Sequence, residues 1–413
     1  MTSLDFSAIL HPDDPPLPLA VMTESGLRSR DTAELRASLT PRLWDYGITR
    51  VANLTGLDNV GIPAHMAVKP QGRSLSSGSG KGSTVDASWV SAVMECAEQH
   101  VWEHLALDTV HASQSTLRRM GLRVTDGSLL PMLKGSLWSP DMAIDWTQGW
   151  DIVAGEPILV PDSLVTLAMK ESRALRPFQS GSNGLASGAH VLEAVLSGLQ
   201  EVIERDGMSL QTMVTPQPTQ NADEFLRRIA PDLMERIERS NTRLEVIDAR
   251  TELGIPTMVA YLLDDNTRVG AFKGAGAGTS NRTALIRAVT EAAQGRTLIT
   301  AGARDDVFET VRSAATSVHA TFSPAGTGQV PVKAFDDDFS AATGSIEGDI
   351  GWYVERLRAH GFEQVIVIRH TRPEEPVQVV RVIVPGLEGY PFATASPGPR
   401  ASAWRRRAEG DVA

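Results

Sequence analysis

Apolar residues recur along the chain with two different periods, which predict strands in some segments and helices in others. Short apolar runs predict strands at "YGITRVANLTG", "GIPAHMAVKP", "RLEVIDART", "IPTMVAYLLDD", "EQVIVIRH" and "VQVVRVIVPG", and an extended segment at "PILVPDSLVTLA". Helical spacing predicts helices at about 84–106, 191–209, 222–240 and 280–300, and at "DIGWYVERLRAHG". This alternation predicts an α/β protein with mixed sheets.

Both ends of the chain are rich in proline and polar residues, which predicts loose extensions. The chain opens with "MTSLDFSAILHPDDPPLPLA" and reads "SPGPRASAWRRRAEGD" near its other end. We therefore expect an N-terminal extension over residues 1–44 and a flexible C-terminal tail over residues 393–413. The glycine-rich and acidic stretch 323–348 predicts a surface loop.

The overall charge and the cysteine content exclude several kinds of partner and site. The 413 residues carry a formal net charge of −11 at pH 7, which argues against a long nucleic-acid or anionic-membrane surface. A single cysteine, Cys96, excludes an internal disulfide framework and a metal site of four cysteines. Neither a signal-like N-terminus nor a membrane-length apolar run occurs. We expect a soluble cytoplasmic protein that binds neither nucleic acid nor membrane.

One pattern of glycines and acids occurs three times, with the template G-x₃-G-x₁₂-E-x₂-[EQ]. Each copy has two glycines, then a glutamate, and then a second acid or amide one helical turn further on. The three sets are Gly78, Gly82, Glu95 and Glu98; Gly184, Gly188, Glu201 and Glu204; and Gly274, Gly278, Glu291 and Gln294. The chain is therefore expected to use one loop-and-helix device three times.

The residue types in this pattern suit a site for magnesium and phosphate. Glycines let backbone N–H groups turn toward an anion, and the following helix dipole adds positive charge. Carboxylates three residues apart share a helical face and suit a hard cation. Lys81, Arg205, Arg287 and Arg296 would supply positive charge for phosphate. The alternative is that the acids are solvated surface residues, but apolar surroundings such as "SAVMECAE" favour a functional site.

Three other motifs suggest different kinds of site, namely a P-loop, a dinucleotide loop and a zinc peptidase. "GSGKGST" lacks the Ser or Thr that a P-loop places after its lysine, and "KGAGAG" lacks the third glycine of a dinucleotide loop. "HVWEH", from His100 to His104, matches the inverted zinc-peptidase motif with Glu103 as the base. Because a zinc site would explain none of the threefold repeat, we prefer two partly exposed helix histidines or pocket residues, and keep a zinc peptidase as an alternative.

Five stretches, in this order, resemble the successive signatures of the YcaO family. The first of these five is in two pieces, "TGLDNVGIPAHMAVKP" and "SGSGKG", and the other four are "SAVMECAE", "SNGLASGAHVLEAVLSGLQEVIERDG", "GAGAGTSNRTALIRAVTEAAQGR" and "VVRVIVPGLE". The resemblance covers residues 45–392 and predicts one YcaO domain there. It implies an α/β fold of mixed sheets, in which ATP and Mg²⁺ lie among facing helices.

The resemblance also implies roles for individual residues. The implied Mg²⁺ ligands are four acids, Glu95, Glu98, Glu201 and Glu204. The implied nucleotide-binding residues are Ser79, Lys81, Glu193, Arg205 and Gln294. The third signature would supply catalytic residues, Arg287, Glu291 and Arg296.

Members of the family activate a peptide backbone amide. A nucleophile adds to the carbonyl carbon, the resulting oxyanion attacks the γ-phosphate of ATP, and phosphate leaves. A neighbouring Cys, Ser or Thr side chain gives an azoline ring, whereas external sulfide gives a thioamide. The resemblance therefore implies modification of a ribosomal peptide or a protein.

The resemblance further implies a partner protein, ThiF-like for azolines or TfuA-like for thioamides. Whether the chain forms a homodimer is left open by the sequence. The second interpretation of the resemblance is an accessory subunit that binds nucleotide and recruits the peptide without catalysis.

Overall fold

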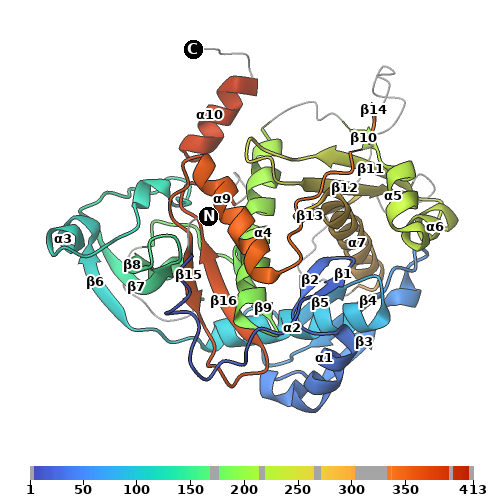
Figure 1. Cartoon of the computed structure of the whole chain (residues 1–413), viewed down its shortest axis with the longest axis horizontal. Helices are drawn as coiled ribbons and strands as arrows, with labels where there is room; N and C mark the ends of the chain where they lie inside the picture. The colour runs from blue at the N-terminus through green and yellow to red at the C-terminus, as the bar shows by residue number, and fades with distance from the viewer. Residues whose placement is uncertain are drawn as a thin grey trace.

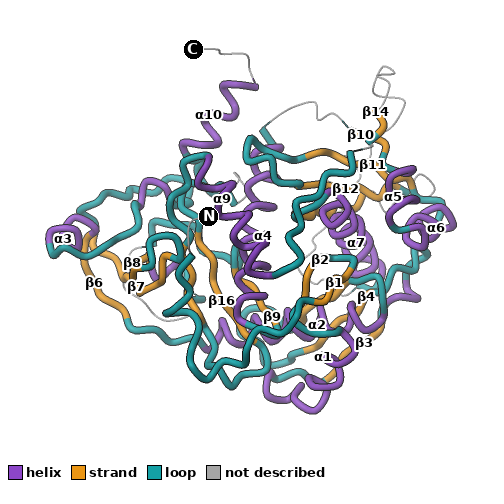
Figure 2. Tube along the Cα trace, viewed as in Figure 1, coloured by secondary structure: helices purple, strands orange, loops and turns teal. Residues whose placement is uncertain are grey.

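Three sheets of three or more strands, one two-stranded hairpin and a set of long helices make up the described part of the chain, which confirms the predicted α/β class (Figures 1 and 2). The computed structural model describes residues 4–167, 176–213, 219–264, 271–302, 333–335, 337–389 and 394–408. Residues 323–332 and 336 of the predicted surface loop lie outside the described residues, as do residues 1–3, 393 and 409–413 of the two predicted extensions.

The sheets are mostly antiparallel, and each has a glycine-containing strand at one edge. The first sheet runs in the order β3 (Arg50–Asn53), β4 (Ala64–Val68), β5 (Ser77–Lys81). The second runs β6 (Thr109–Ser113), β7 (Ala143–Asp151), β15 (Ile366–Arg369), β16 (Gln378–Ile383), β9 (Leu185–Gly188), with β8 (Glu156–Pro161) paired to β7. The third runs β13 (Ala271–Ala277), β12 (Thr257–Leu263), β11 (Arg243–Asp248), β10 (Gln220–Asn221), β14 (Lys333–Ala334).

Three long helices follow the three glycine-containing edge strands. They are α2 (Val85–His104) after β5, α4 (Val191–Gln211) after β9, and α7 (Asn281–Thr300) after β13. The remaining elements are the hairpin β1 (Val21–Thr23) and β2 (Gly26–Arg28), and the helices α1 (Thr32–Leu39), α3 (Gln114–Arg119), α5 (Asp223–Ile229), α6 (Pro231–Arg239), α9 (Ile346–Ala359) and α10 (Pro399–Ala408).

The helix predicted over 222–240 is two helices, α5 and α6, which meet at Ala230. Proline disfavours the helical conformation of the residue before it, and Ala230, before Pro231, has φ −149° and ψ 69°. None of the helices in the described part of the chain combines the length and the hydropathy that a bilayer crossing requires.

Three of the six repeated glycines, Gly78, Gly188 and Gly274, lie in strands and not in the predicted loops, and these strands pack tightly on the following helix. A Cβ atom at Gly80 would lie 2.0 Å from the carbonyl oxygen of Ser88, and one at Gly276 would lie 2.3 Å from that of Ala284. A Cβ at Gly188 would lie 2.6 Å from the nitrogen of Ala194. The glycines are therefore needed for close approach of strand and helix backbones.

The same residue position caps each of the three helices. Thr84, His190 and Ser280 each lie two residues after the second glycine of the template, and each side chain accepts a hydrogen bond from a backbone N–H in the first helical turn. The three helices therefore begin at equivalent positions, and this places Glu95, Glu201 and Glu291 at equivalent depths along them.

The three strand–helix units close into a ring. α2 contacts β5 and also β9, α4 contacts β9 and also β13, and α7 contacts β13 and also β5. Each helix thus packs against its own strand and against the strand of the next unit. Figure 1 shows α4 between the sheet that contains β16 and the sheet that contains β13. This ring agrees with the facing helices predicted for the fold.

The two ends are not loose where the structure describes them. Ile9 and Leu27 are buried in one apolar cluster with residues of α4, and Leu35 and Leu39 are buried against α2. Near the other end, α10 contacts α4. Composition predicted extensions because these segments are rich in proline and polar residues, but several of their apolar residues lie against the core.

The glycine contacts generate a stability prediction. Gly276→Ala should lower the free energy of unfolding by about 3 kcal/mol or more, because the new methyl group meets backbone atoms that cannot rotate away. Gly295→Ala, in the paired helix α7, is the matched control, since a Cβ there meets nothing within 4 Å and alanine favours the helix. Denaturant unfolding of both variants measures this, and equal stabilities would contradict the packing argument.

Candidate functional site

Five glutamates from three helices lie close enough together to affect one another's ionisation. Glu98 on α2 faces Glu201 on α4, Glu204 on α4 faces Glu291 on α7, and Glu291 also faces Glu95 on α2. We call these five residues the acid cluster. Each helix of the ring therefore contributes to it, as the threefold sequence pattern predicts.

Burial and mutual repulsion raise the pKa of most carboxyl groups in the acid cluster, because both disfavour the charged form. Burial, and then the charges of Glu201 and Glu95, raise the pKa of Glu98 well above its usual value. Burial raises the pKa of Glu201 to about 7. The pKa of Glu204 is also raised, by burial and then by Glu291. Such a group of carboxylates is stable in its charged form only beside cations.

Side chains of opposite charge reach the acid cluster from three elements. Lys81 on β5 pairs with Glu291, and together with nearby arginines it lowers the pKa of Glu291 although burial would raise it. Arg287 donates a hydrogen bond of 2.6 Å to Gln200 and lies 3.9 Å from Glu204. Arg205 lies 3.6 Å from Glu201.

Two of the predicted nucleotide-binding residues, Ser79 and Lys81, contact the acid cluster. The backbone N–H of Ser79 donates to Glu95 over 2.8 Å, so Ser79 orients that acid. Ser79 and Lys81 lie on strand β5 and not in the predicted loop. Gln294 is buried one turn after Glu291 on α7.

Glu193 lies in the first turn of α4 and is bound by the N-terminal hairpin. Its carboxylate accepts hydrogen bonds from the backbone N–H and the hydroxyl of Ser29, at 3.2 and 2.5 Å, and Arg28 lies 3.8 Å away. Burial lowers the pKa of Arg28, Glu193 opposes that shift, and the charge of Arg287 adds to it. The like charges of Arg28 and Arg287 therefore face each other, an arrangement that a bound anion would relieve.

The sequence patterns did not reveal Arg28 and Ser29. The only signal in the sequence is that Arg28 is the first lysine or arginine of the chain, after an acidic and proline-rich stretch. Since the hairpin is held by contacts remote in sequence, no local pattern predicts that it reaches α4.

Arg296, a predicted catalytic residue, binds a different set of acids. Its guanidinium donates to Asp58 over 2.7 Å and to Asp264 over 2.8 Å, and all three side chains are buried. Its ion pairs in the described chain thus run to Asp58 and Asp264 and not to the acid cluster. These pairs join α7 to two loops, and a catalytic role for Arg296 remains a prediction.

The geometry around "HVWEH" argues against the zinc-peptidase alternative. Glu103 is buried and pairs with Lys69 over 2.8 Å, and the backbone N–H of Ser74 also donates to it. These bonds, which outweigh burial, lower the pKa of Glu103 to about 2. His104 is exposed and bonds the carbonyl of His100. Glu103 therefore holds a loop in place and is not a free base beside two histidines.

The acid cluster fits Mg²⁺ when phosphate shares the coordination. Among the described residues no three carboxylate, imidazole or thiol groups enclose a metal position by themselves. Mg²⁺ bound with a nucleotide needs only one or two carboxylates, with phosphate oxygens and waters completing the shell. The acid pairs between helices, with Lys81 and Arg287 beside them, meet that requirement.

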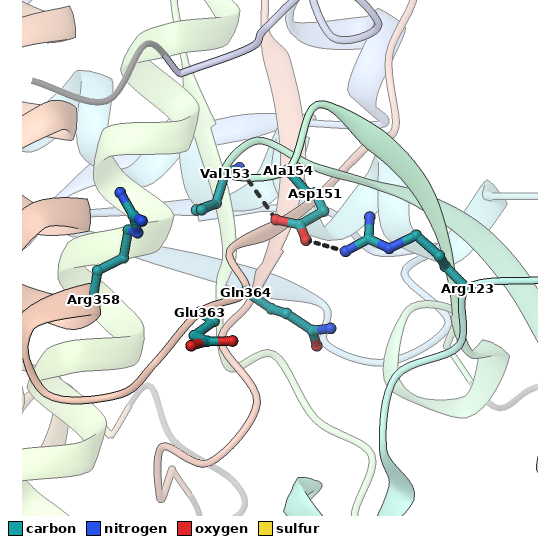
Figure 3. A pocket seen from close by; sticks show the side chains of 7 residues that line it. All are labelled: Arg123, Asp151, Val153, Ala154, Arg358, Glu363 and Gln364. Atoms are coloured by element: carbon teal, nitrogen blue, oxygen red, sulfur yellow. Dashed lines mark hydrogen bonds and ion pairs between the residues drawn. The ribbon is translucent and has the colours of Figure 1, made fainter.

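A cavity of about 400 Å³ lies elsewhere, between the β7–β8 turn and the end of α9 (Figure 3). It is lined by Arg123, Asp151, Val153, Ala154, Arg358, Glu363 and Gln364. Arg123 points toward Asp151 and bonds it over 2.8 Å. None of the predicted site residues lines this cavity.

Comparison with known proteins identifies the family. The family described as YcaO cyclodehydratase, ATP- and Mg²⁺-binding, matches residues 79–388. The chain belongs to the YcaO family. The predicted cofactors, ATP and Mg²⁺, are those of this family description, and the resemblance seen in the sequence is confirmed.

Individual relatives support the same conclusion. An uncharacterized protein in the tfuA 3′ region of Rhizobium leguminosarum bv. trifolii is 33% identical over 382 residues, covering 87% of this chain and 88% of that protein. The YcaO structure of Methanopyrus kandleri bound with AMPPCP and Mg²⁺ has a TM-score of 0.70 at 25% identity, covering 92% of this chain and 98% of that one. A heterocyclase in complex with substrate and cofactor shares the fold, with a TM-score of 0.72 at 21% identity, covering 95% of this chain and 58% of that one.

The raised pKa of Glu201 generates a prediction on stability. The folded pKa of about 7 lies above the usual 4.5, so this group stabilises the fold below pH 4.5 and the stabilisation is lost as pH rises to about 7. Without metal, its contribution to the free energy of unfolding should fall over that range by up to about 3 kcal/mol.

The difference between wild type and Glu201→Gln isolates this effect. Glu201→Gln should be more stable than wild type at pH 8 and lose that advantage near pH 4, in denaturant unfolding at both pH values. Glu347→Gln, at an exposed position on α9, should follow wild type throughout. Parallel pH profiles for wild type and Glu201→Gln would show that Glu201 does not carry a raised pKa.

Proposed function

We propose that the chain is an ATP-dependent enzyme that activates a backbone amide of a ribosomal peptide or protein. With a TfuA-like partner it would convert that amide into a thioamide. The observation that carries the proposal is the meeting of five glutamates from α2, α4 and α7 beside Lys81 and Arg287. Membership of an ATP- and Mg²⁺-binding family supports it.

The residues present allow a division of roles. Glu95, Glu98, Glu201 and Glu204 would hold Mg²⁺, while Lys81, Arg205 and Glu193 would face the nucleotide. External sulfide would first add to the amide carbon and form the C–S bond. Bound MgATP would supply the γ-phosphoryl group to the amide oxygen, so that the C–O bond then breaks and phosphate leaves with the sulfur-bound proton. Lys81 and Arg287, which pair with Glu291 and Glu204, would neutralise negative charge that grows on phosphate.

The remaining side chains orient these groups. Glu291 pairs with Lys81, and Gln200 accepts a hydrogen bond from Arg287, so each cation is held toward the acid cluster before ligand binds. The ion pairs of Arg296 with Asp58 and Asp264 favour a positioning role over the predicted catalytic role. Preorganised charges of this kind lower a barrier without rearrangement during the reaction.

The product class rests on a relative. The similar protein of Rhizobium leguminosarum is named for its place in the tfuA 3′ region. This favours a TfuA-like partner and sulfide as the nucleophile for the present chain. The family description as cyclodehydratase supports a second candidate, azoline formation with a ThiF-like partner.

Mass spectrometry of the substrate distinguishes the two products. The chain, MgATP, a sulfide source, a TfuA-like protein and a short precursor peptide encoded nearby would be incubated together. Exchange of oxygen for sulfur is the expected result. Loss of water would indicate an azoline instead, and ATP binding without any peptide change, with either partner, would favour the accessory subunit.

A single substitution tests whether the acid cluster carries the activity. Glu204→Gln should lower peptide-dependent phosphate release by at least about 100-fold. Its melting temperature should not fall, because removing one charge from crowded carboxylates relieves repulsion. Glu347→Gln is the matched control and should keep wild-type rates. Unfolding of Glu204→Gln, or full activity, would contradict the assignment.

A further inference from the structure

Asp206 is a buried carboxylate on α4 that the proposed reaction does not use. It follows Glu204 and Arg205 in sequence and is 0% exposed. Since successive helical residues are about 100° apart, Asp206 lies about 200° around α4 from Glu204, on the side away from the acid cluster. A buried carboxylate in this position needs a partner of its own.

That partner is Arg400, at the start of α10. The guanidinium of Arg400 donates to both oxygens of Asp206, at 3.0 and 2.9 Å. Arg400 also pairs with Glu252 and lies over the ring of Phe362, 5.2 Å from its centroid. Its side chain is only 11% exposed, so water competes little for these bonds.

A second carboxylate fixes the segment that carries Arg400. The backbone N–H of Glu388 donates to Asp206 over 2.9 Å. The side chain of Glu388 accepts hydrogen bonds from the backbone N–H groups of Gly398 and Ala401, at 3.2 and 2.9 Å. Both ends of this connection are therefore tied to α4. Figure 1 shows α10 leaving the body of the molecule beyond this point.

This attachment lies at the turn of α4 that carries Glu201 and Glu204. Glu201 and Glu204 face acids on α2 and α7, and like charges in such a cluster repel one another when they are ionised and no metal is bound. Arg400 holds the same turn from its opposite side. A helix held by a bidentate bond resists both translation and rotation.

We propose that Arg400 is a positioning residue for the metal site, acting through Asp206 to keep Glu201 and Glu204 within reach of Mg²⁺. The proposal rests on the proposed function for its ligand. Arg400 lies outside the segment that matches the family, residues 79–388.

The first test is Mg²⁺-dependent binding of a non-hydrolysable ATP analogue, measured by calorimetry. In Arg400→Gln the Mg²⁺ concentration for half-saturation should rise about 10-fold, the loss typical when a residue supporting metal ligands is removed. Excess Mg²⁺ should restore full stoichiometry, since every ligand is still present. Arg400→Lys should show a smaller shift, and Arg405→Gln, an exposed control on the same helix, none.

The second test needs no ligand. Hydrogen exchange of the metal-free chain should be faster in Arg400→Gln at the end of α4, residues 201–211, and unchanged in α2 and α7. Glu252→Gln, which weakens the attachment but leaves Asp206 paired, should give a smaller effect of the same kind and serves if Arg400→Gln does not fold.

The outcomes separate this proposal from the proposed function. An unchanged Mg²⁺ requirement, a loss of binding that excess Mg²⁺ does not restore, or unchanged exchange at the end of α4 would overturn the role of Arg400. Failure of the wild-type chain to bind the analogue with Mg²⁺ would overturn the proposed function instead, and the exchange experiment would still decide whether Arg400 holds α4.

Discussion

Repulsion among buried carboxylates is the constraint on which the rest of this structure depends. Five glutamates are held together inside a ring of three helices, where burial alone raises the pKa of most of them. The ring resists this repulsion because its backbones pack closely at glycines such as Gly80 and Gly276 and because each helix is capped at the same position. Bound metal and nucleotide would offset the repulsion among these five carboxylates.

The helix α4 is held at both ends by segments from the two ends of the chain. Ser29 of the N-terminal hairpin bonds Glu193 in the first turn, and Arg400 of α10 bonds Asp206 near the other end. Between these attachments lie Glu201 and Glu204. Residues outside the segment that matches the family therefore fix the helix that supplies two of the proposed metal ligands.

The sequence predicts the acid cluster well and its surroundings poorly. The spacing from glycine to glutamate is local and repeated, so the sequence alone reveals which residues share a helical face. The glycines were expected in loops because turns and close packing both select glycine, and only tertiary contacts distinguish them. Arg296 resembled a phosphate ligand because its partners, Asp58 and Asp264, are remote in sequence. Arg28 and Arg400 lie in segments whose composition gave no sign of burial.

A crystal structure with Mn²⁺ in place of Mg²⁺ and a non-hydrolysable ATP analogue tests the central claim most directly. Anomalous scattering from Mn²⁺ should place metal between α2 and α4 or between α4 and α7, within coordination distance of glutamates from two helices. The phosphates should lie beside Lys81 and Arg287. Metal and nucleotide bound elsewhere, with the five glutamates still facing one another unliganded, would contradict the account.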